Sequence, residues 1–275
     1  MSISRFFKRA PSVPAAKFLE QRVGYAVGDI HGRADLLGQL LDLLESRVEE
    51  DRRAAGPPLV VFLGDYVDRG PQSASVIDML LDRPKGFERR FLMGNHEQSM
   101  LAFLAAPMEN KAWLMHGGAD TLMSYGVKPP PSLGAEDSDW SEVAGQLKER
   151  VPEVHGAFLA RLERYVQLGD YAFVHAGVDP GRPMEEQTDA DLFWIRDRFL
   201  SDKRHMPLRV VHGHTPAAAP YADHRRVGID TGAYASGVLT AARFEGENVS
   251  FVSVRDPAAE ARAAANKKRD RFRRR

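Results

Sequence analysis

Several features are missing from this 275-residue sequence, and each absence narrows what the protein can do. There is no cysteine, which excludes disulfides, thiolate metal ligands and a cysteine nucleophile together. No apolar stretch approaches the length that a membrane-spanning helix needs. The formal net charge is zero, so no overall field favours nucleic acid or acidic membranes. What is present is 43% hydrophobic residues, enough for one large domain.

The two ends of the chain differ in composition from the rest. Residues 1–20 place Phe6 and Phe7 among basic residues, but the apolar segment of a secretory signal does not follow, so we predict a cytoplasmic protein. Residues 257–275 end in a basic run. Such a run can contact nucleic acid or an anionic surface, yet we favour a disordered, solubilising tail. Between these two tails we predict one folded domain over residues 21–256.

Five short segments rich in Asp, His and Asn stand out, and each follows an apolar run typical of a buried strand. In chain order they are Gly28-Asp29-Ile30-His31-Gly32, Gly64-Asp65-Tyr66-Val67-Asp68-Arg69-Gly70, Gly94-Asn95-His96-Glu97, His175-Ala176-Gly177 and His212-Gly213-His214-Thr215. This placement puts residues that are far apart in sequence at one edge of one sheet.

The order of apolar runs and helical patterns predicts the fold class. Expected strands at 23–27, 59–63 and 90–93 alternate with expected helices at 34–50 and 73–81, which predicts parallel strands with crossover helices. Strands are also expected at 171–174 and 208–211. Three more, between 226 and 254, have no helices between them, so we expect them to be antiparallel. We therefore predict an α/β (α+β) protein in which two mixed β-sheets pack as a central sandwich flanked by helices.

The stretch from about 97 to 168 is mostly helical in character. It is interrupted by Pro129-Pro130-Pro131 and by an acidic loop that runs through Asp139. We predict a helical insertion that covers one side of the site. Its large apolar side chains are expected to pack the insertion and not to bind a ligand: Trp113, Met115 and Leu122.

The residue types in the five segments suit a pair of divalent metal ions. Two ions about 3.5–4 Å apart activate a shared water as a hydroxide nucleophile and neutralise the oxygens of a phosphate ester. Asp29 and His31 alternate along an extended strand end, so their side chains point to the same side, and Asp65 is the expected bridging carboxylate. The other predicted ligands are Asn95, His175 and His214. Oxygen mixed with imidazole favours Mn²⁺, with Fe or Zn²⁺ as alternatives, and disfavours Ca²⁺.

Other polar residues of the segments suggest proton transfer and phosphate binding. His96 adjoins Asn95 and cannot easily reach the same metal, so we expect it to act as a general acid toward the leaving oxygen. Asp68 would hold that imidazole and raise its pKa. Arg69 offers a guanidinium for the phosphoryl oxygens, and Arg196 is a second candidate.

Two residues next to expected site residues need separate interpretation. Only one of His212 and His214 is expected to bind metal, and His212 is expected to face the phosphate or to support a ligand. Glu97 follows His96 but is expected to satisfy backbone donors at a helix N-terminus. The remaining histidines lack companions at ligand spacing and are expected to be structural or exposed: His116, His155, His205 and His224.

On these motifs the chain resembles the phosphoprotein phosphatase branch of the calcineurin-like metallophosphoesterases, in the compact form typical of bacteria and phage. The matching motifs run in order from Gly28 to about Gly232. The resemblance implies that one metal is bound by Asp29, His31 and Asp65, and the other by Asp65, Asn95, His175 and His214. It also implies an acid dyad of Asp68 and His96, and phosphate contacts from Arg69, Asn95 and the distal Arg196.

Three hydrolytic functions stay open at this point. The Asp-Arg-Gly end of the second segment favours a phosphomonoesterase of the serine/threonine protein phosphatase class. A bis(5'-nucleosyl)-tetraphosphatase would share the metal ligands, but such enzymes typically lack an acidic residue at the position of Asp68. A phosphodiesterase has only the basic tail in its favour. A non-catalytic binding module would be expected to lose a ligand or the acid, and this chain has lost none. The expected substrate is thus a phosphorylated protein or a nucleotide.

Overall fold

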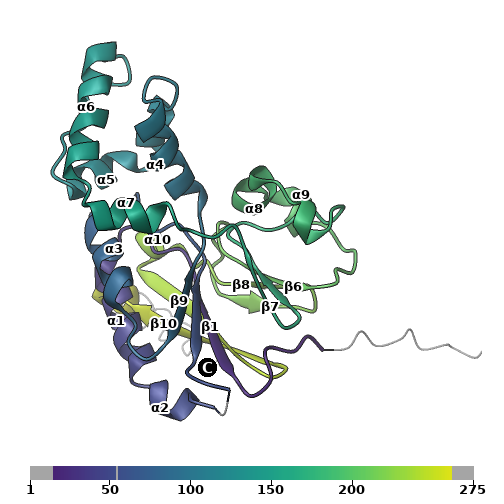
Figure 1. The fold of residues 1–275 in the computed structure, drawn as a ribbon. Coiled ribbons are helices and arrows are strands. Elements are labelled where there is room, and N and C mark those ends of the chain that lie inside the picture. Colours follow the sequence, from purple (N-terminus) through teal and green to yellow (C-terminus); the bar gives the residue numbers. More distant parts are fainter. Residues whose placement is uncertain (1–14, 54, 262–275) are drawn as a thin grey trace, which may run out of the picture.

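The structure is a computed structural model that describes residues 15–53 and 55–261. Two five-stranded sheets form its centre (Figure 1). The first contains, in spatial order, β10 (Asn248–Arg255), β9 (Val238–Glu245), β1 (Val23–Val27), β2 (Leu59–Phe62) and β3 (Glu88–Phe91). The second contains β4 (Val166–Leu168), β5 (Tyr171–Phe173), β6 (Arg209–His212), β8 (Arg226–Gly228) and β7 (Tyr221–Ala222).

Strand directions agree with the sequence-based expectation except at β8. The pairs β1–β2 and β2–β3 are parallel, whereas β9 is antiparallel to both β1 and β10. The prediction that the strands after residue 226 are all antiparallel is wrong for β8, which runs parallel to β6. The reason is the short strand β7, which pairs antiparallel with β8. The chain reverses through β7, so β8 returns beside β6 without a crossover helix.

Alternating side chains place two hydrophobic cores on opposite faces of the first sheet. On β1, Tyr25 and Val27 join the core under the helices, whereas Ala26 faces the second sheet. On β2, Phe62 likewise faces the helices and Val61 faces the other sheet. Aromatic rings of the second sheet and of β9 fill the space between the sheets. The predicted sandwich of two mixed sheets is confirmed.

Helices cover the outer face of each sheet (Figure 1). Beside the first sheet lie α1 (Ala34–Glu45), α2 (Val48–Asp51) and α3 (Ser73–Asp82). Leucines at helical spacing bury one side of α1, which explains its packing against the sheet. The single helix predicted over 34–50 is divided into α1 and α2. The second sheet is covered by η2 (Met184–Glu186), α8 (Asp189–Trp194) and α9 (Asp197–Leu200), and α10 (Ala233–Ser236) precedes β9.

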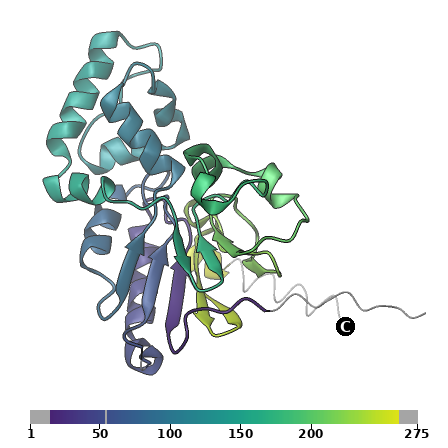
Figure 2. The same cartoon turned by 45° about the vertical axis from the view of Figure 1, so that its right-hand side comes forward.

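The helical insertion packs against α3, and its teal helices lie at the top of the molecule, above the first sheet, in Figure 2. It consists of α4 (Asn95–Ala105), η1 (Lys111–His116), α5 (Gly118–Ser124), α6 (Asp137–Arg150) and α7 (Glu153–Leu159). The predicted end at 168 is too late, because residues 166–168 form β4 and pair with β5. Trp113, Trp140 and Phe103 belong to the same core as the first sheet, so the insertion is packed continuously with it.

The extremities are only partly described. Phe6, Phe7 and residues 262–275 lie outside the described residues, so the predictions about the tails are not tested there. The helices described in residues 15–53 and 55–261 do not include one with the length and hydropathy of a membrane span.

Candidate metal centre

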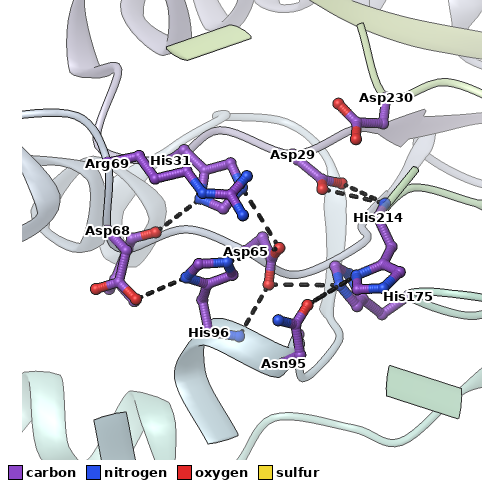
Figure 3. A network of polar contacts seen from close by, with 12 residues as sticks. Asp29, His31, Asp65, Asp68, Arg69, Asn95, His96, His175, His214 and Asp230 are labelled. Atoms are coloured by element: carbon purple, nitrogen blue, oxygen red, sulfur yellow. Dashed lines mark hydrogen bonds and ion pairs between the residues drawn. The ribbon is translucent and has the colours of Figure 1, made fainter. Parts of the chain in front are cut away.

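Each of the five sequence segments reaches the same place in the fold from the carboxyl end of a strand (Figure 3). Asp29 follows β1, Asp65 follows β2, and Asn95 follows β3 at the start of α4. From the second sheet, His175 follows β5 and His214 follows β6. All five side chains are buried, with no more than 6% of any of them exposed. The distant residues do converge as predicted, but the expectation of one edge of one sheet is wrong, because the two sheets of the sandwich both contribute strand ends.

The backbone around these side chains is strained. Six non-glycine residues in the described part of the chain have positive φ, and five of them belong to the segments: His31 (47°), Asp65 (52°), Asp68 (73°), Arg69 (68°) and His214 (63°). Such conformations cost about 1–3 kcal/mol each and persist only where the surroundings hold them. Here the carbonyl of Asp65 accepts hydrogen bonds from the backbone of both Ile30 and His31. Strain is therefore concentrated where the side chains converge.

Two glycines are needed because a side chain would collide with a ligand carboxylate. A Cβ on Gly94 would lie 2.2 Å from Oδ1 of Asp65, and one on Gly213 would lie 2.1 Å from Oδ1 of Asp29. Both distances are far below van der Waals contact. These glycines let one segment approach the carboxylate of another.

Glu97 holds the loop that carries Asp65. Its carboxylate accepts hydrogen bonds from the backbone N–H groups of Asp65 (2.9 Å), Tyr66 (2.7 Å), Val67 (3.1 Å) and Gly94 (3.0 Å). The expectation that Glu97 satisfies backbone donors is confirmed. Burial, together with the charge of Asp65, raises its pKa to about 7.

Two sets of buried side chains come close enough together to hold a metal ion, and Asp65 belongs to both. One set is His31, Asp65 and His96, and the other is Asp65, His175 and His214. A carboxylate shared between two sets is the arrangement expected of a bridging ligand. The two sets therefore support a binuclear centre.

Hydrogen bonding around the second set leaves ligand atoms facing one another. Nδ1 of His175 lies 2.8 Å from the carbonyl of Leu63, so Nδ1 carries the ring proton and Nε2 presents a lone pair. That lone pair lies 2.9 Å from the amide oxygen of Asn95 and 3.2 Å from Nδ1 of His214. Nε2 of His175 and the amide oxygen of Asn95 both present lone pairs, so they repel each other at this distance unless a cation lies between them. The residues thus fit a metal ion.

The imidazoles have the protonation state that metal binding requires. Burial lowers the pKa of His31 to about 3 and that of His214 to about 2, and it also lowers the pKa of His175. Neutral imidazole is the ligating form. In addition, Nδ1 of His31 lies 2.9 Å from the carbonyl of Val67, which leaves Nε2 as the lone pair, 3.4 Å from Asp65.

Asp29 lies beside a carboxylate that the sequence interpretation overlooked. Both oxygens of Asp29 accept from the backbone N–H of His214, at 3.1 and 3.2 Å. Burial raises the pKa of Asp29, and the charges of Asp230 and Asp65 raise it further. Asp230 has a pKa raised to about 6, chiefly by burial. Asp230 comes just after strand β8, in the same way that the predicted site residues come after their strands. That position was the signal in the sequence that identifies Asp230 as a site residue. A cation would relieve this crowding of buried acids.

His96 and Asp68 form the predicted pair. Nδ1 of His96 lies 2.7 Å from Oδ2 of Asp68, and Nε2 faces the cluster, 3.9 Å from Oδ2 of Asp65. Burial opposes protonation of His96, but the charges of Asp65 and Asp68 and the hydrogen bond to Asp68 raise its pKa. Nε2 of His96 is placed equally well to bind a metal ion and to donate a proton, so the general-acid role stays a prediction.

The two arginines that are expected to bind phosphate differ in their placement. Nη1 of Arg69 lies 3.0 Å from Nε2 of His31. The guanidinium of Arg69 lies over the ring of Tyr234, 4.6 Å from the ring centroid. Arg196 is exposed, and its charge helps to lower the pKa of His175. Arg69 therefore borders the cluster, and the phosphate contacts of both arginines stay predictions.

His212 lies apart from the cluster. Its ring nitrogens contact the carbonyl of Gly213 and the hydroxyl of Tyr221, each at 3.1 Å, and its ring packs against Phe199. Only 1% of the residue is exposed. Because the protein engages both nitrogens, the contacts do not support the expectation that His212 faces phosphate. They agree with the other expectation, that His212 supports a ligand, since its ring contacts the turn that carries His214.

Residues of the insertion reach the site, although the sequence showed no signal for them. The indole of Trp113 and the hydroxyl of Thr121 both donate to the carboxylate of Asp68. The expectation that Trp113 only packs the insertion is therefore incomplete. Neither residue lies in a recognisable motif.

A buried cluster of carboxylates and neutral imidazoles at the ends of strands in a two-sheet sandwich defines a metal-dependent hydrolase. Residues 25–245 match the calcineurin-like phosphoesterase family, and the chain belongs to that family.

Relatives within the family carry two different names. The chain is 28% identical over 257 residues to a bis(5'-nucleosyl)-tetraphosphatase PrpE (asymmetrical) of Halalkalibacterium halodurans, covering 83% of this chain and 92% of the relative. It is 30% identical over 227 residues to serine/threonine-protein phosphatase 1 of Salmonella typhimurium, covering 80% and 91%. Among solved structures, a candidate diadenosine tetraphosphatase matches with a TM-score of 0.58 at 20% identity, over 86% of this chain and 98% of that one. That structural likeness supports the shared fold.

Proposed function

We propose that this phosphoesterase is a bis(5'-nucleosyl)-tetraphosphatase, which cleaves a dinucleoside tetraphosphate into a nucleoside triphosphate and a nucleoside monophosphate. The similarity to PrpE of Halalkalibacterium halodurans supports this choice over the protein phosphatase that Asp68 favoured in the sequence. When bound, two divalent ions would polarise the phosphoryl oxygens and lower the pKa of a water molecule. The residues around the cluster supply the rest.

The observation that carries the proposal is an exposed aromatic ring at the edge of the cluster. Trp194 is 46% exposed, and its ring lies 6.5 Å from that of His214. Its indole N–H donates to Gln98 at 2.7 Å, so the ring is held in place before a ligand arrives. Stacking of a base on an aromatic side chain contributes about 1–3 kcal/mol. A nucleobase next to the reacting phosphate can therefore bind to Trp194.

A second aromatic ring lies at the other end of the cluster. Tyr234 is 39% exposed, and its ring lies 5.3 Å from that of His31. The side chains of His31 and His214 lie on opposite sides of Asp65 (Figure 3). The cluster thus has an aromatic ring near each end, which suits a ligand with a base at each end of a phosphate chain.

The test compares three substrates with the Mn²⁺-loaded protein: diadenosine tetraphosphate, a phosphoserine peptide without aromatic residues, and an aryl phosphodiester. We expect the highest kcat/KM on the dinucleotide, with ATP and AMP as products by anion-exchange chromatography. Trp194→Ala should lower that kcat/KM about 10–100-fold and leave hydrolysis of the peptide nearly unchanged. Trp194→Phe, which keeps an aromatic face, is the matched control. A higher kcat/KM on the peptide would reject the proposal.

A serine/threonine protein phosphatase is the second candidate, and the pair His96–Asp68 favours it. An alkoxide from phosphoserine is a poor leaving group and needs a proton, whereas a nucleoside triphosphate leaves readily without one. The match to the Salmonella typhimurium phosphatase agrees with this candidate. The same three-substrate assay decides between the two.

A further inference from the structure

The turn between η1 and α5 in the helical insertion packs directly on the loop that carries Asp68 and Arg69. The backbone N–H of Arg69 donates to the carbonyl of Gly117 at 3.3 Å. A Cβ on Gly117, whose φ is 107°, would lie 2.5 Å from the same nitrogen. The insertion and the loop are therefore in van der Waals contact at the backbone, with no room for a side chain between them.

Side chains of η1 and α5 donate hydrogen bonds to both oxygens of the Asp68 carboxylate. Nε1 of Trp113 donates to Oδ2 at 2.8 Å, and Oγ1 of Thr121 donates to Oδ1 at 2.6 Å. Oδ2 also lies 2.7 Å from Nδ1 of His96. Asp68 and Thr121 are fully buried, and Trp113 is 3% exposed. Hydrogen bonds that are buried and involve a charge are strong and directional.

Thr121 also accepts a hydrogen bond from the backbone of Asp68, which is one of the strained residues. The N–H of Asp68, at φ 73°, donates to Oγ1 of Thr121 at 2.9 Å and lies 3.1 Å from Oγ of Ser73. The two hydroxyls lie 3.0 Å apart. A left-handed conformation at Asp68 is unfavourable in isolation. These contacts stabilise it.

We propose that Trp113 and Thr121 are positioning residues for proton transfer: they hold Asp68 so that His96 presents Nε2 to the leaving oxygen. This inference rests on the proposed phosphoester hydrolysis, and it concerns the esters whose leaving oxygen needs a proton from His96. The carboxylate of Asp68 accepts hydrogen bonds from two donors besides the imidazole, and these bonds fix its orientation. The fixed carboxylate in turn sets the plane of the His96 ring and keeps the proton on Nδ1. The segment from η1 to α5 therefore contributes to catalysis although it contains none of the sequence motifs.

The step that depends on this geometry is the departure of the leaving group. As the P–O bond breaks, its electron pair stays on the leaving oxygen, and the proton on Nε2 of His96 passes to that oxygen. Water supplies the new oxygen on phosphorus. Nδ1 of the imidazole keeps its proton and its bond to Asp68. Proton donation matters most for basic leaving groups and little for acidic ones.

The experiment is therefore a leaving-group series on the Mn²⁺-loaded full-length protein, from 2,4-dinitrophenyl phosphate through phenyl phosphate to an alkyl phosphate. Thr121→Val removes the hydroxyl at constant shape, and Thr121→Ser retains it. We expect Thr121→Val to lower kcat on phenyl and alkyl phosphate about tenfold or more, and on the dinitrophenyl ester less than about twofold. Thr121→Ser should restore hydrolysis of the basic leaving groups.

Trp113→Phe provides a second variant, which keeps the aromatic packing and removes only the N–H donor. It should show the same dependence on the leaving group, with KM nearly unchanged. Equal losses on all esters, for both Thr121→Val and Trp113→Phe, would mean that these residues only maintain the fold and would overturn the inference alone. A wild-type protein that hydrolyses none of these esters but cleaves diadenosine tetraphosphate would overturn this inference and leave the proposed function standing.

Discussion

At the candidate metal centre, residues from strand ends lie beside side chains from the helical insertion, and the two groups are held in different ways. Asp65 and His214 adopt positive φ in tight loops, with Gly94 and Gly213 making room for the carboxylates. Trp113 and Thr121 come instead from helical turns and act through hydrogen bonds to Asp68. The strand ends thus carry the candidate metal ligands, and the insertion supplies hydrogen bonds to a neighbouring carboxylate.

The largest expected effect comes from removing the carboxylate that both sets of ligands share. Asp65→Asn should lower metal occupancy at both positions, and hydrolysis should fall to the background rate, because the bridging charge is lost. Metal content per protein by elemental analysis checks this. Asp82→Asn, in an exposed ion pair on α3, is the control and should keep its metal. Retention of two metals by Asp65→Asn would show that another residue bridges them.

The next effect separates metal binding from proton transfer. His96→Ala should lower turnover of phosphoserine peptide about 10²–10⁴-fold, the typical contribution of a general acid, while metal content stays nearly unchanged. Loss of metal from one position in this variant would show that His96 is a ligand. Its place beside His31 and Asp65 allows that role.

The third effect concerns the packing of the insertion. Phe103 is fully buried, and its ring lies 5.0 Å from Trp113 and 6.2 Å from Trp140. Phe103→Ala should lower the free energy of unfolding by about 3–5 kcal/mol, and Phe103→Leu by less. Because the insertion shares its core with the first sheet, urea denaturation should show one transition. Two separate transitions would indicate that the insertion unfolds independently.

The smallest expected effect is a change in pH dependence. Asp65 and Asp68 raise the pKa of His96 against the effect of burial, so the protonated acid persists to higher pH than usual. Asp68→Asn removes one of these charges and lowers that pKa. The alkaline limb of kcat against pH should therefore move to lower pH on a phosphate ester with a basic leaving group. A limb that does not move would remove His96 from the proton-transfer step.

Sequence patterns predicted the parts of the fold that depend on local order. Buried strands such as 59–63 were recognisable from continuous apolar runs, and the helix at 73–81 from its spacing. The direction of β8 was missed because β7 has only two residues, too few for a pattern. The end of the insertion was misplaced for a similar reason, since β4 has three residues.

Site residues were predictable only where residue type and strand end coincide. Asp29 and His175 met both conditions. His212 did too, yet its nitrogens are engaged by Gly213 and Tyr221. The role of Thr121 had no local signal, because its partner Asp68 is 53 residues away in sequence. Packing of distant helices decides such contacts.

The types of the candidate metal ligands, their order and their positions after strands could all be read from the sequence, because these depend on local chemistry and local periodicity. They were enough to indicate the family of phosphoesterases. The contacts that hold Asp68, the carboxylate beside Asp29 and the exposed Trp194 at the border of the cluster became visible in the folded structure. These features arise where separate elements pack together, and no single segment encodes the distance between them.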